Sequence, residues 1–131
     1  DCAKACCANL EALIPDLKTP DLWVGADAPK LQIAQFVKGD SVEQFEKGHT
    51  YVVEFWATWC GPCIKAFPHL SELQAKLHED VTFMGVNVWD TKKDESQAQR
   101  IERVSGFVGQ PGKKMSYTVP VEAGGQSAKT W

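Results

Sequence analysis

The sequence predicts an α/β domain in which helices cover a largely parallel central sheet. Segments with the composition of buried strands alternate along the chain with segments that have helical spacing of apolar residues, and the connections between them are short. Strands that alternate with helices in this way commonly lie parallel in one sheet. The length of 131 residues fits one hydrophobic core, and 44% hydrophobic residues are enough to fill it. We divide the chain into a Cys-containing helical extension, residues 1–21, and a layered domain, residues 22–131.

The first elements predicted are a short helix and a half-buried strand. Residues 3–13 favour a helix, which Pro15 and Pro20 end because proline clashes inside a helix and lacks an N–H. Residues 31–36 then alternate apolar and polar side chains, which is the period of a half-buried strand. Lys-Gly-Asp at residues 38–40 predicts the turn that ends it.

The most apolar segment predicts a central strand followed directly by a helix. Residues 51–57 are rich in β-branched and aromatic side chains, as in a strand covered on both faces, and Glu54 alone interrupts them. Pro62 suits the first turn of the helix that follows, where a missing N–H costs nothing. Apolar residues recur there at helical spacing, at Phe67, Leu70, Leu73 and Leu77.

The second half of the chain continues the alternation. Residues 81–89 predict another buried strand, and the polar residues 94–108 predict a surface helix that ends near Gly109. Residues 114–121 predict an edge or outer strand, and residues 128–131 begin a further element after a Gly-Gly turn.

A Cys-x-x-Cys pair lies between the apolar strand and its helix. This order places Cys60 at a helix N-terminus, where free N–H groups and the helix dipole stabilise a thiolate. Cys60 is therefore the expected nucleophile. Cys63 lies within the first turn, close enough to attack the sulfur of Cys60 once a mixed disulfide has formed.

Two other interpretations of the cysteine pair are a structural zinc half-site and an inert disulfide. A zinc site needs a second ligand pair, and the downstream histidines, His69 and His78, do not have the spacing of a Cys2His2 finger. An inert disulfide fits a buried position, whereas Trp59, Gly61 and Pro62 suit an exposed turn. The missing second ligand pair and the exposed turn both favour a redox-active cysteine pair, and no metal site is predicted.

The segment around the pair resembles the thioredoxin superfamily. Residues 53–63 carry this resemblance, with the sequence Val-Glu-Phe-Trp-Ala-Thr-Trp-Cys-Gly-Pro-Cys, together with Pro68 in the helix beyond. The flanks at residues 24–29, 117–119 and 128–131 resemble its TlpA-like redoxin branch, so the resemblance covers about residues 22–131. It implies a thioredoxin-like fold with a mixed central sheet sandwiched by helices.

The resemblance also implies a function. It implies a thiol–disulfide oxidoreductase that acts on protein disulfide or dithiol substrates and exchanges electrons with a separate donor, without a bound cofactor. Trp59 would shape the rim beside Cys60, and Gly61 and Pro62 would form the helix start. Gly-Pro is the thioredoxin dipeptide, and thioredoxin lies near about −270 mV against about −120 mV for a strong oxidant, which favours a reductant. The TlpA-like branch works in the periplasm or anchored to membranes, so an extracytoplasmic location is expected.

Glu54, six residues before Cys60, aligns with the buried acid that accepts the proton of the resolving thiol in thioredoxin. A carboxyl among Val, Phe and Trp should be desolvated, which raises its pKa and allows proton exchange near neutral pH. The alternative is that Glu54 points to an edge and pairs with a lysine.

The family also has a cis-proline opposite the cysteine pair, followed by two strands and a helix. Pro120 is the candidate among residues 64–131, but too few residues follow it for those elements. The alternative is a truncated or proteolysed chain that lacks the cis-proline loop and the last strands and helix. Such a chain would leave a central strand with an open edge, which could pair with a second copy.

Cys2, Cys6 and Cys7 form a separate group near the N-terminus. With five cysteines in total, at least one thiol is unpaired within the monomer. The three could be free thiols, could include a disulfide typical of exported proteins, or could bind a soft metal such as Cu(I) or Zn(II).

Composition excludes several partners and leaves two alternative functions. The net charge is −3 and no run of Lys or Arg exceeds two residues, so we expect no nucleic acid partner. No apolar run approaches the roughly 20 residues that cross a bilayer. The first residue, Asp1, is not Met, so an upstream segment, such as a signal peptide, is expected to have been removed.

A thioredoxin-fold metal-binding or interaction module with cysteine ligands is the main alternative to the oxidoreductase function. A peroxiredoxin-type peroxidase is less favoured, because Trp56 and Thr58 stand where that family has Pro and Thr.

Overall fold

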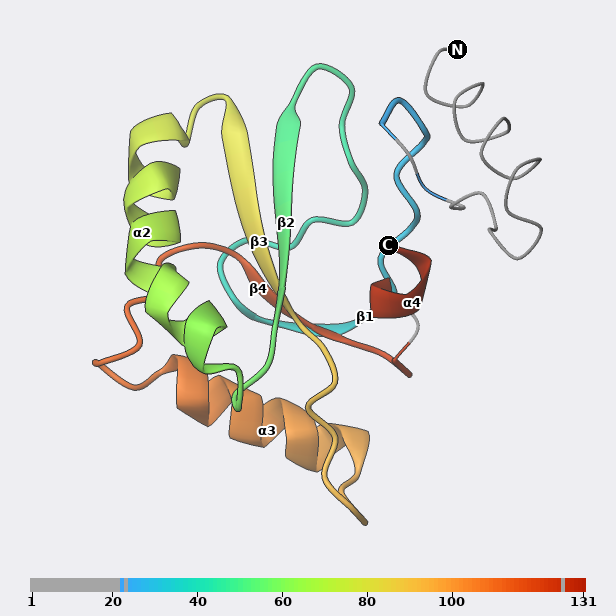
Figure 1. The fold of residues 1–131 in the computed structure, drawn as a ribbon, viewed down its shortest axis with the longest axis vertical. Helices are drawn as coiled ribbons and strands as arrows, with labels where there is room; N and C mark the ends of the chain where they lie inside the picture. Colours follow the sequence, from blue (N-terminus) through green and yellow to red (C-terminus); the bar gives the residue numbers. More distant parts are fainter. Residues whose placement is uncertain (1–21, 23, 126) are drawn as a thin grey trace, which may run out of the picture.

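The central sheet has four strands in the order β1-β4-β3-β2 (Figure 1). The computed structural model describes residues 22, 24–125 and 127–131, and the helical extension predicted for residues 1–21, with Cys2, Cys6 and Cys7, lies outside them. β2 pairs parallel with β3 and β3 with β4, whereas β1 pairs antiparallel with β4. The predicted α/β class with a mixed sheet is confirmed. The strands are β1 (Ile33–Lys38), β2 (Thr50–Trp56), β3 (Val81–Asn87) and β4 (Val119–Glu122).

Two helices connect the parallel strands and pack on one face of the sheet. α2 (Gly61–Leu77) leads from β2 to β3, and α3 (Gln97–Val108) leads from β3 to β4. Crossovers between parallel strands are right-handed, and both advance in the same direction across the sheet, so both helices reach the same face. The ring of Trp56 lies in this core, with centroid distances of 5.1 Å to Phe67 of α2 and 5.8 Å to Phe107 of α3.

A smaller aromatic cluster covers the opposite face of β2. Successive side chains of a strand point to opposite faces, so Phe55 points away from the main core. Its ring centroid lies 6.1 Å from that of Trp131, which follows the short helix α4 (Ser127–Thr130). The Trp131 ring lies equally far, 6.1 Å, from Phe45. Helices therefore contribute to both faces of the sheet, as the family resemblance implied.

The strand predicted at residues 114–121 corresponds to β4, but its predicted place at an edge is wrong. β4 lies between β1 and β3, and all four of its residues are buried. Its sequence, Val-Pro-Val-Glu, conceals this place because proline and carboxylates ordinarily occur at edges. β3 pairs with β4 at Asn87–Val121, and a single bridge joins Met84 to Thr118 just before β4, so neither pairing uses Pro120, which has no N–H to donate. The described peptide bonds are all trans, so Pro120 is not the cis-proline of the family.

β2 lies at one end of the sheet order, although its composition predicted a central strand. Within the described residues β2 pairs only with β3, and its side chains from Thr50 to Phe55 are exposed or half-buried. Apolar side chains report what covers the faces of a strand, and they carry no information about which backbone pairs alongside it. The sequence pattern therefore could not distinguish an edge from a centre.

α3 begins three residues later than predicted, because Ser96 starts it. The Ser96 hydroxyl accepts a hydrogen bond from the Gln99 N–H at 3.2 Å, and the Gln99 side chain accepts one from the Ser96 N–H at 2.9 Å. This capping box satisfies two free N–H groups at the helix start. Asp94 lies outside the helix with a φ of 61°. The predicted end near Gly109 is confirmed.

Candidate redox site

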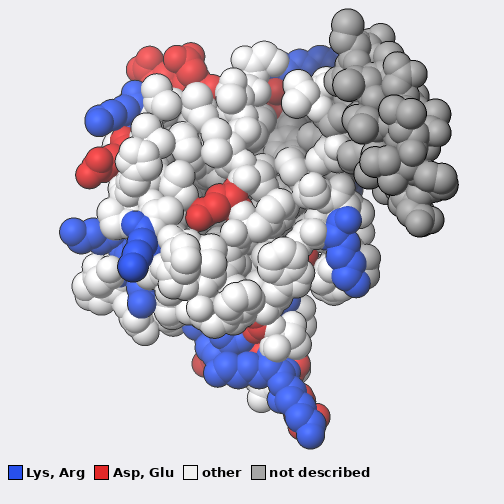
Figure 2. Space-filling view, viewed as in Figure 1, with Lys and Arg blue, Asp and Glu red and all other residues white. Residues whose placement is uncertain are grey.

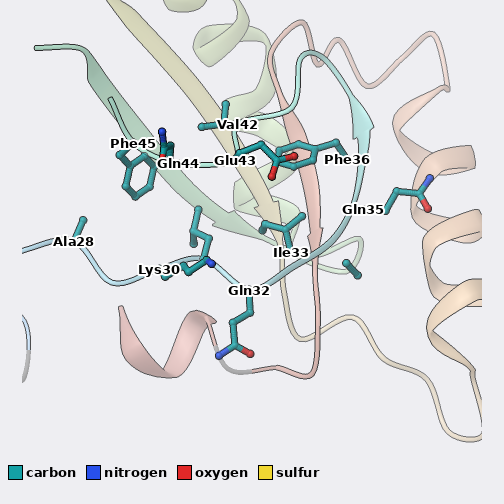
Figure 3. A pocket seen from close by; sticks show the side chains of 12 residues that line it. Ala28, Lys30, Gln32, Ile33, Gln35, Phe36, Val42, Glu43, Gln44 and Phe45 are labelled. Atoms are coloured by element: carbon teal, nitrogen blue, oxygen red, sulfur yellow. The ribbon is translucent and has the colours of Figure 1, made fainter. Parts of the chain in front are cut away.

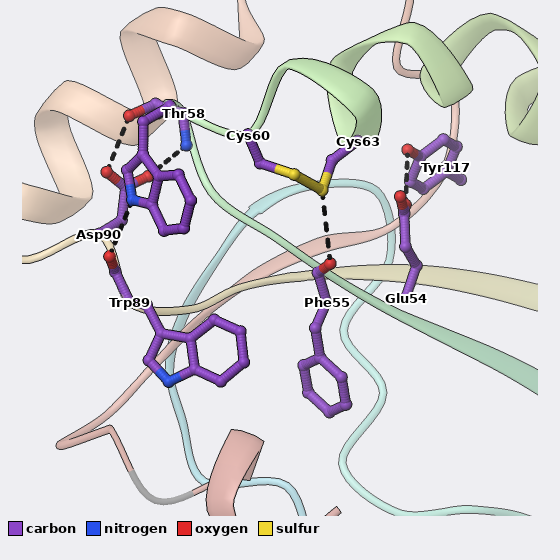
Figure 4. The surroundings of a disulfide bond; sticks show 9 residues. Glu54, Phe55, Thr58, Cys60, Cys63, Trp89, Asp90 and Tyr117 are labelled. Atoms are coloured by element: carbon purple, nitrogen blue, oxygen red, sulfur yellow. Dashed lines mark hydrogen bonds between the residues drawn. A yellow bond between two sulfur atoms is a disulfide. The ribbon is translucent and has the colours of Figure 1, made fainter.

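The cysteine pair lies at the start of α2, directly after the end of β2 (Figure 4). The chain turns before it, because the Cys60 N–H donates to the Ala57 carbonyl at 3.0 Å. Cys60 is the N-cap of α2, and its carbonyl accepts a helical hydrogen bond from the Ile64 N–H at 3.1 Å. Pro62 occupies the first turn. A disulfide joins Cys60 to Cys63, whose Cα atoms are 5.3 Å apart.

The start of α2 favours a negative sulfur on Cys60. No side-chain hydrogen bond caps this helix N-terminus, where free N–H groups and the helix dipole stabilise an anion. Cys63 lies inside the first turn, with its Sγ 4.0 Å from the Phe55 carbonyl oxygen. Both cysteines are half-buried, whereas Gly61 and Pro62 between them are exposed. A substrate can therefore approach the pair from the turn.

Glu54 lies on β2, on the face that α2 covers. Figure 4 shows its side chain on the opposite side of the strand from Phe55, and its Oε2 accepts a hydrogen bond from the Tyr117 hydroxyl at 3.4 Å. Burial raises the pKa of Glu54, and the bond from Tyr117 offsets this only in part. Burial and the Glu54 charge likewise raise the pKa of Tyr117, so that this hydroxyl keeps its proton. No lysine of the described chain forms an ion pair with Glu54.

Gly85 creates the space in which Tyr117 meets Glu54. Gly85 stands opposite Glu54 in the ladder between β2 and β3. A Cβ at residue 85 would lie 2.8 Å from Cε2 of Tyr117 and 3.3 Å from Nε1 of Trp56. The Gly85 carbonyl instead accepts a hydrogen bond from the Trp56 indole at 2.8 Å. The missing side chain therefore lets both rings lie directly against β3.

A second carboxylate, Asp90, binds the turn that precedes Cys60 (Figure 4). Its Oδ2 accepts hydrogen bonds from the Thr58 N–H and the Asn87 side chain, each at 2.7 Å. Its Oδ1 accepts from the Thr58 hydroxyl at 2.8 Å and from Arg103 at 3.2 Å. Burial opposes ionisation, but the bonds from Asn87 and Thr58 and the charge of Arg103 outweigh it and hold the pKa of Asp90 below its usual value.

Two exposed tryptophans lie beside this turn. Trp59 is 66% exposed and Trp89 is 59% exposed, and the Trp59 indole N–H donates to the Trp89 carbonyl at 3.0 Å. The sequence named Trp59 but did not lead us to Trp89, Asp90 or Tyr117. A signal was present for two of them. Trp89 and Asp90 follow a buried strand parallel to β2, and the carboxyl ends of parallel strands meet at one edge of the sheet, where sites commonly form.

A cavity of about 940 Å³ lies away from the cysteine pair (Figure 3). Residues 28–36, apart from Pro29, line it together with residues 42–45. None of the predicted site residues is among them, so this cavity does not belong to the redox centre.

The surface carries charges of both signs. In the view of Figure 2, basic side chains lie in separate groups toward the edges of the molecule, and acidic side chains lie at the upper left, near the middle and among the basic groups at the bottom. In the part of the chain that the structure describes, no three His, Cys, Asp or Glu side chains gather as a metal site. None of the helices found there has the length and apolar character needed to span a bilayer.

Comparison with known proteins identifies the family. The family model described as Thioredoxin matches residues 31–120. The thiol-disulfide oxidoreductase ResA of Bacillus thuringiensis subsp. konkukian is 30% identical over 115 residues, which cover 87% of this chain and 60% of that protein. The thioredoxin H-type of Fagopyrum esculentum is 40% identical over 70 residues, which cover 50% of this chain and 59% of that protein. The chain thus spans about three fifths of the length of these relatives.

A solved structure shares the fold. StoA from Bacillus subtilis superposes with a TM-score of 0.57 at 20% identity, over 77% of this chain and 70% of that chain. At this identity the likeness concerns the fold alone. The family match, in contrast, includes the strand, the Cys-Gly-Pro-Cys turn and the helix that together hold Cys60 and Cys63. The resemblance seen in residues 53–63 is confirmed, and the chain belongs to the thioredoxin family.

Proposed function

We propose that this chain is a thiol–disulfide oxidoreductase that reduces disulfides of protein substrates. The observation that carries the proposal is the Cys60–Cys63 disulfide at the uncapped N-terminus of α2, behind an exposed Gly-Pro turn. A pair in this position can be both a nucleophile and its own resolving group. The thiol-disulfide oxidoreductase ResA among the relatives supports the same reaction class.

The reaction starts from the reduced pair. The Cys60 thiolate attacks one sulfur of the substrate disulfide, so that a mixed disulfide forms and one substrate thiolate leaves. Cys63 then loses its proton and attacks the Sγ of Cys60, which releases the second substrate thiolate. Two electrons pass to the substrate, and the Cys60–Cys63 disulfide remains. A separate dithiol donor reduces this disulfide and restores the starting state.

Glu54 is proposed as the group that takes the proton of Cys63. It lies on the face of β2 beneath α2, and burial raises its pKa, so it holds a proton to higher pH than an exposed carboxylate does. Trp59 is proposed as part of the rim that receives the substrate, because its ring is exposed beside Cys60. Gly61 and Pro62 are proposed to keep that rim open and the helix start rigid.

Alkylation and trapping test the assignment of the two cysteines. Iodoacetamide added to the reduced, folded protein should label Cys60 first, since its sulfur lies at the helix N-terminus. Cys63→Ser should accumulate a stable mixed disulfide with a substrate protein, and Cys60→Ser should accumulate none. Preferential labelling of Cys63, or trapping by Cys60→Ser, would reverse the roles. A pair that does not cycle with dithiothreitol in protein that contains stoichiometric metal would favour the metal-binding alternative.

An extracytoplasmic location is proposed from the resemblance of residues 24–29, 117–119 and 128–131 to the TlpA-like branch. A reductant working there needs a dithiol donor outside the cytoplasm. Labelling of Cys60 in intact cells by a thiol reagent that does not cross the inner membrane would support this location. Labelling only after lysis would contradict it.

Self-association through β2 is proposed from its place at the end of the sheet. Among the described residues no strand pairs with the side of β2 away from β3, so the backbone N–H and C=O groups there could pair with those of a second copy. Sedimentation velocity at increasing protein concentration should then show a dimer. A single monomeric species at every concentration would contradict pairing at this edge.

A further inference from the structure

We propose that Asp90 is a positioning residue of the redox centre, which fixes the turn that delivers Cys60 to the start of α2. The inference rests on the proposed function, because it concerns how Cys60 is held for its attack. It assigns to Asp90 a mechanical role that acts through Thr58. Asp90 itself does not contact the sulfur atoms.

The turn consists of residues 57–60, and both of its central residues are tied to the same two-residue segment. Thr58 gives its N–H and its hydroxyl to the two carboxylate oxygens of Asp90. Trp59 gives its indole N–H to the carbonyl of Trp89. Three hydrogen bonds therefore join the turn before Cys60 to the segment that follows β3.

The Trp89–Asp90 segment is itself fixed. Trp89 has a φ of 50°, a left-handed conformation that a tryptophan adopts only where its surroundings enforce it. Arg103 of α3 donates to the carbonyl of Asp90 as well as to its carboxylate. Glu95 holds the other side of the same guanidinium at 2.7 and 2.9 Å. These contacts determine where the carboxylate lies.

The buried side-chain amide of Asn87 fixes the position of Oδ2 of Asp90. Arg100, which is 3% exposed, donates to the carbonyl oxygen of the Asn87 side chain at 3.1 Å and to its backbone carbonyl at 3.0 Å. The Asn87 amide nitrogen must then point the other way, where it donates to Oδ2 of Asp90 at 2.7 Å. The carboxylate thus receives donors on both oxygens, and only an acceptor at each position satisfies them.

Replacing the carboxylate by an amide breaks this arrangement without changing its shape. In Asp90→Asn one of the two oxygens becomes an NH2 group, which faces either the Thr58 and Asn87 N–H donors or Arg103 and the Thr58 hydroxyl. Either orientation sets donor against donor, and the charge pairing with Arg103 is lost. Electrostatics alone predicts the opposite effect on Cys60, since removal of a nearby negative charge favours a thiolate. The direction of the change therefore separates positioning from charge.

Three variants and two controls test the proposal by the rate of Cys60 alkylation in the reduced protein at neutral pH. We expect Asp90→Asn to slow alkylation about tenfold, since bonds to a charged group that fix a reacting atom are lost. Thr58→Val removes the hydroxyl, which donates to Asp90 and accepts from Arg103 at 3.4 Å, and should slow alkylation severalfold, whereas Thr58→Ser keeps the hydroxyl and should restore the rate. Asp80→Asn and Thr50→Val make the same chemical changes at the opposite ends of β3 and β2 and serve as controls.

A spectroscopic measurement reports on the contact itself. In a 15N-labelled sample the Thr58 amide should show strong protection from hydrogen exchange in the parent protein and in Thr58→Ser, and weak protection in Asp90→Asn. Near-ultraviolet circular dichroism establishes that each variant is folded. If Asp90→Asn is folded and reacts as fast as the parent or faster, or if Thr58→Val reacts as fast as Thr58→Ser, the positioning role is overturned. Failure of the parent protein to reduce any substrate disulfide would instead count against the proposed function.

Discussion

Glu54 and Asp90 carry the same carboxylate, one on β2 and the other just after the neighbouring strand β3, but the chain surrounds them differently. Glu54 accepts one long hydrogen bond, from Tyr117, and burial raises its pKa. Asp90 accepts four hydrogen bonds, and its pKa is lowered despite burial. A poorly satisfied carboxyl can gain and lose a proton during a reaction cycle, whereas a fully satisfied carboxylate remains charged and holds its donors in place. The number of donors, more than burial, separates the two roles.

The largest expected effect is on stability at Asp90. Asp90→Ala leaves the Thr58 N–H and the Asn87 amide without their acceptor and removes one of the acceptors of Arg103, so the free energy of unfolding should fall by about 3 kcal/mol. Glu54→Gln keeps an oxygen that can accept the single bond from the Tyr117 hydroxyl and should change this free energy by less than about 1 kcal/mol. Urea denaturation at neutral pH measures both. Equal losses in the free energy of unfolding for Asp90→Ala and Glu54→Gln would contradict the different structural roles given to the two carboxyl groups.

A somewhat smaller loss is expected at Gly85, the residue that makes room for the Glu54–Tyr117 contact. Gly85→Ala places a Cβ within 2.8 Å of the Tyr117 ring, which is buried and has little room to move. Overpacking of this kind should lower the free energy of unfolding by about 2 kcal/mol. The same urea series provides the measurement, with Gly112→Ala as control, since a Cβ at Gly112 meets nothing within 4 Å. No loss in Gly85→Ala would mean that Tyr117 can lie elsewhere.

A kinetic effect is expected at Glu54. Glu54→Gln keeps the shape of the side chain and removes its titration, so resolution by Cys63 should slow about tenfold while the first attack by Cys60 changes little. Single-turnover reduction with the two phases followed separately measures this. Tyr117→Phe keeps the acid but removes the donor that lowers the pKa of Glu54, so it should shift the pH dependence of resolution upward. Unchanged phases in Glu54→Gln would mean that the proton goes to water.

The smallest effect appears only as a difference between stability curves. The pKa of Asp90 is depressed in the folded state, so its contribution is present above the unfolded pKa, near 3.8, and is lost as the pH falls through the folded value. The pKa of Glu54 is raised, so its contribution is present below the unfolded pKa, near 4.5, and is lost as the pH rises through the folded value. In a plot of the free energy of unfolding against pH, Asp90→Asn should reduce the loss of stability toward acid pH. Glu54→Gln should reduce the loss of stability as the pH rises above that range. Matching changes in both variants would contradict the opposite signs.

Much of the fold followed from patterns that are local in sequence. The apolar runs of β2 and β3 and the spacing of α2 identified these elements, because burial and periodicity act within one segment. The place of β4 did not follow, since it depends on which backbones lie beside it. The start of α3 did not follow either, since residues 94–96 are polar like the helix itself, whereas the capping box of Ser96 and Gln99 makes Gln97 its first residue.

The site divides in the same way. Cys60, Cys63 and Glu54 could be named because a single segment, residues 53–63, carries them. Asp90 and Tyr117 come from two other segments, 27 residues or more beyond Cys63, and reach the site through the pairing of β2, β3 and β4. Long-range contacts of this kind leave no periodicity in the chain.

Gly85 has a consequence for how related chains can differ. It stands opposite Glu54, and the ring of Tyr117 occupies the volume that a side chain at residue 85 would need. The three positions can therefore change only together: a relative with a larger residue in place of Gly85 should have a smaller residue, or a ring that lies elsewhere, in place of Tyr117. The carboxyl in place of Glu54 would then lose its donor. Covariation among these three positions should be stronger than that between any of them and the cysteines, whose chemistry permits no exchange.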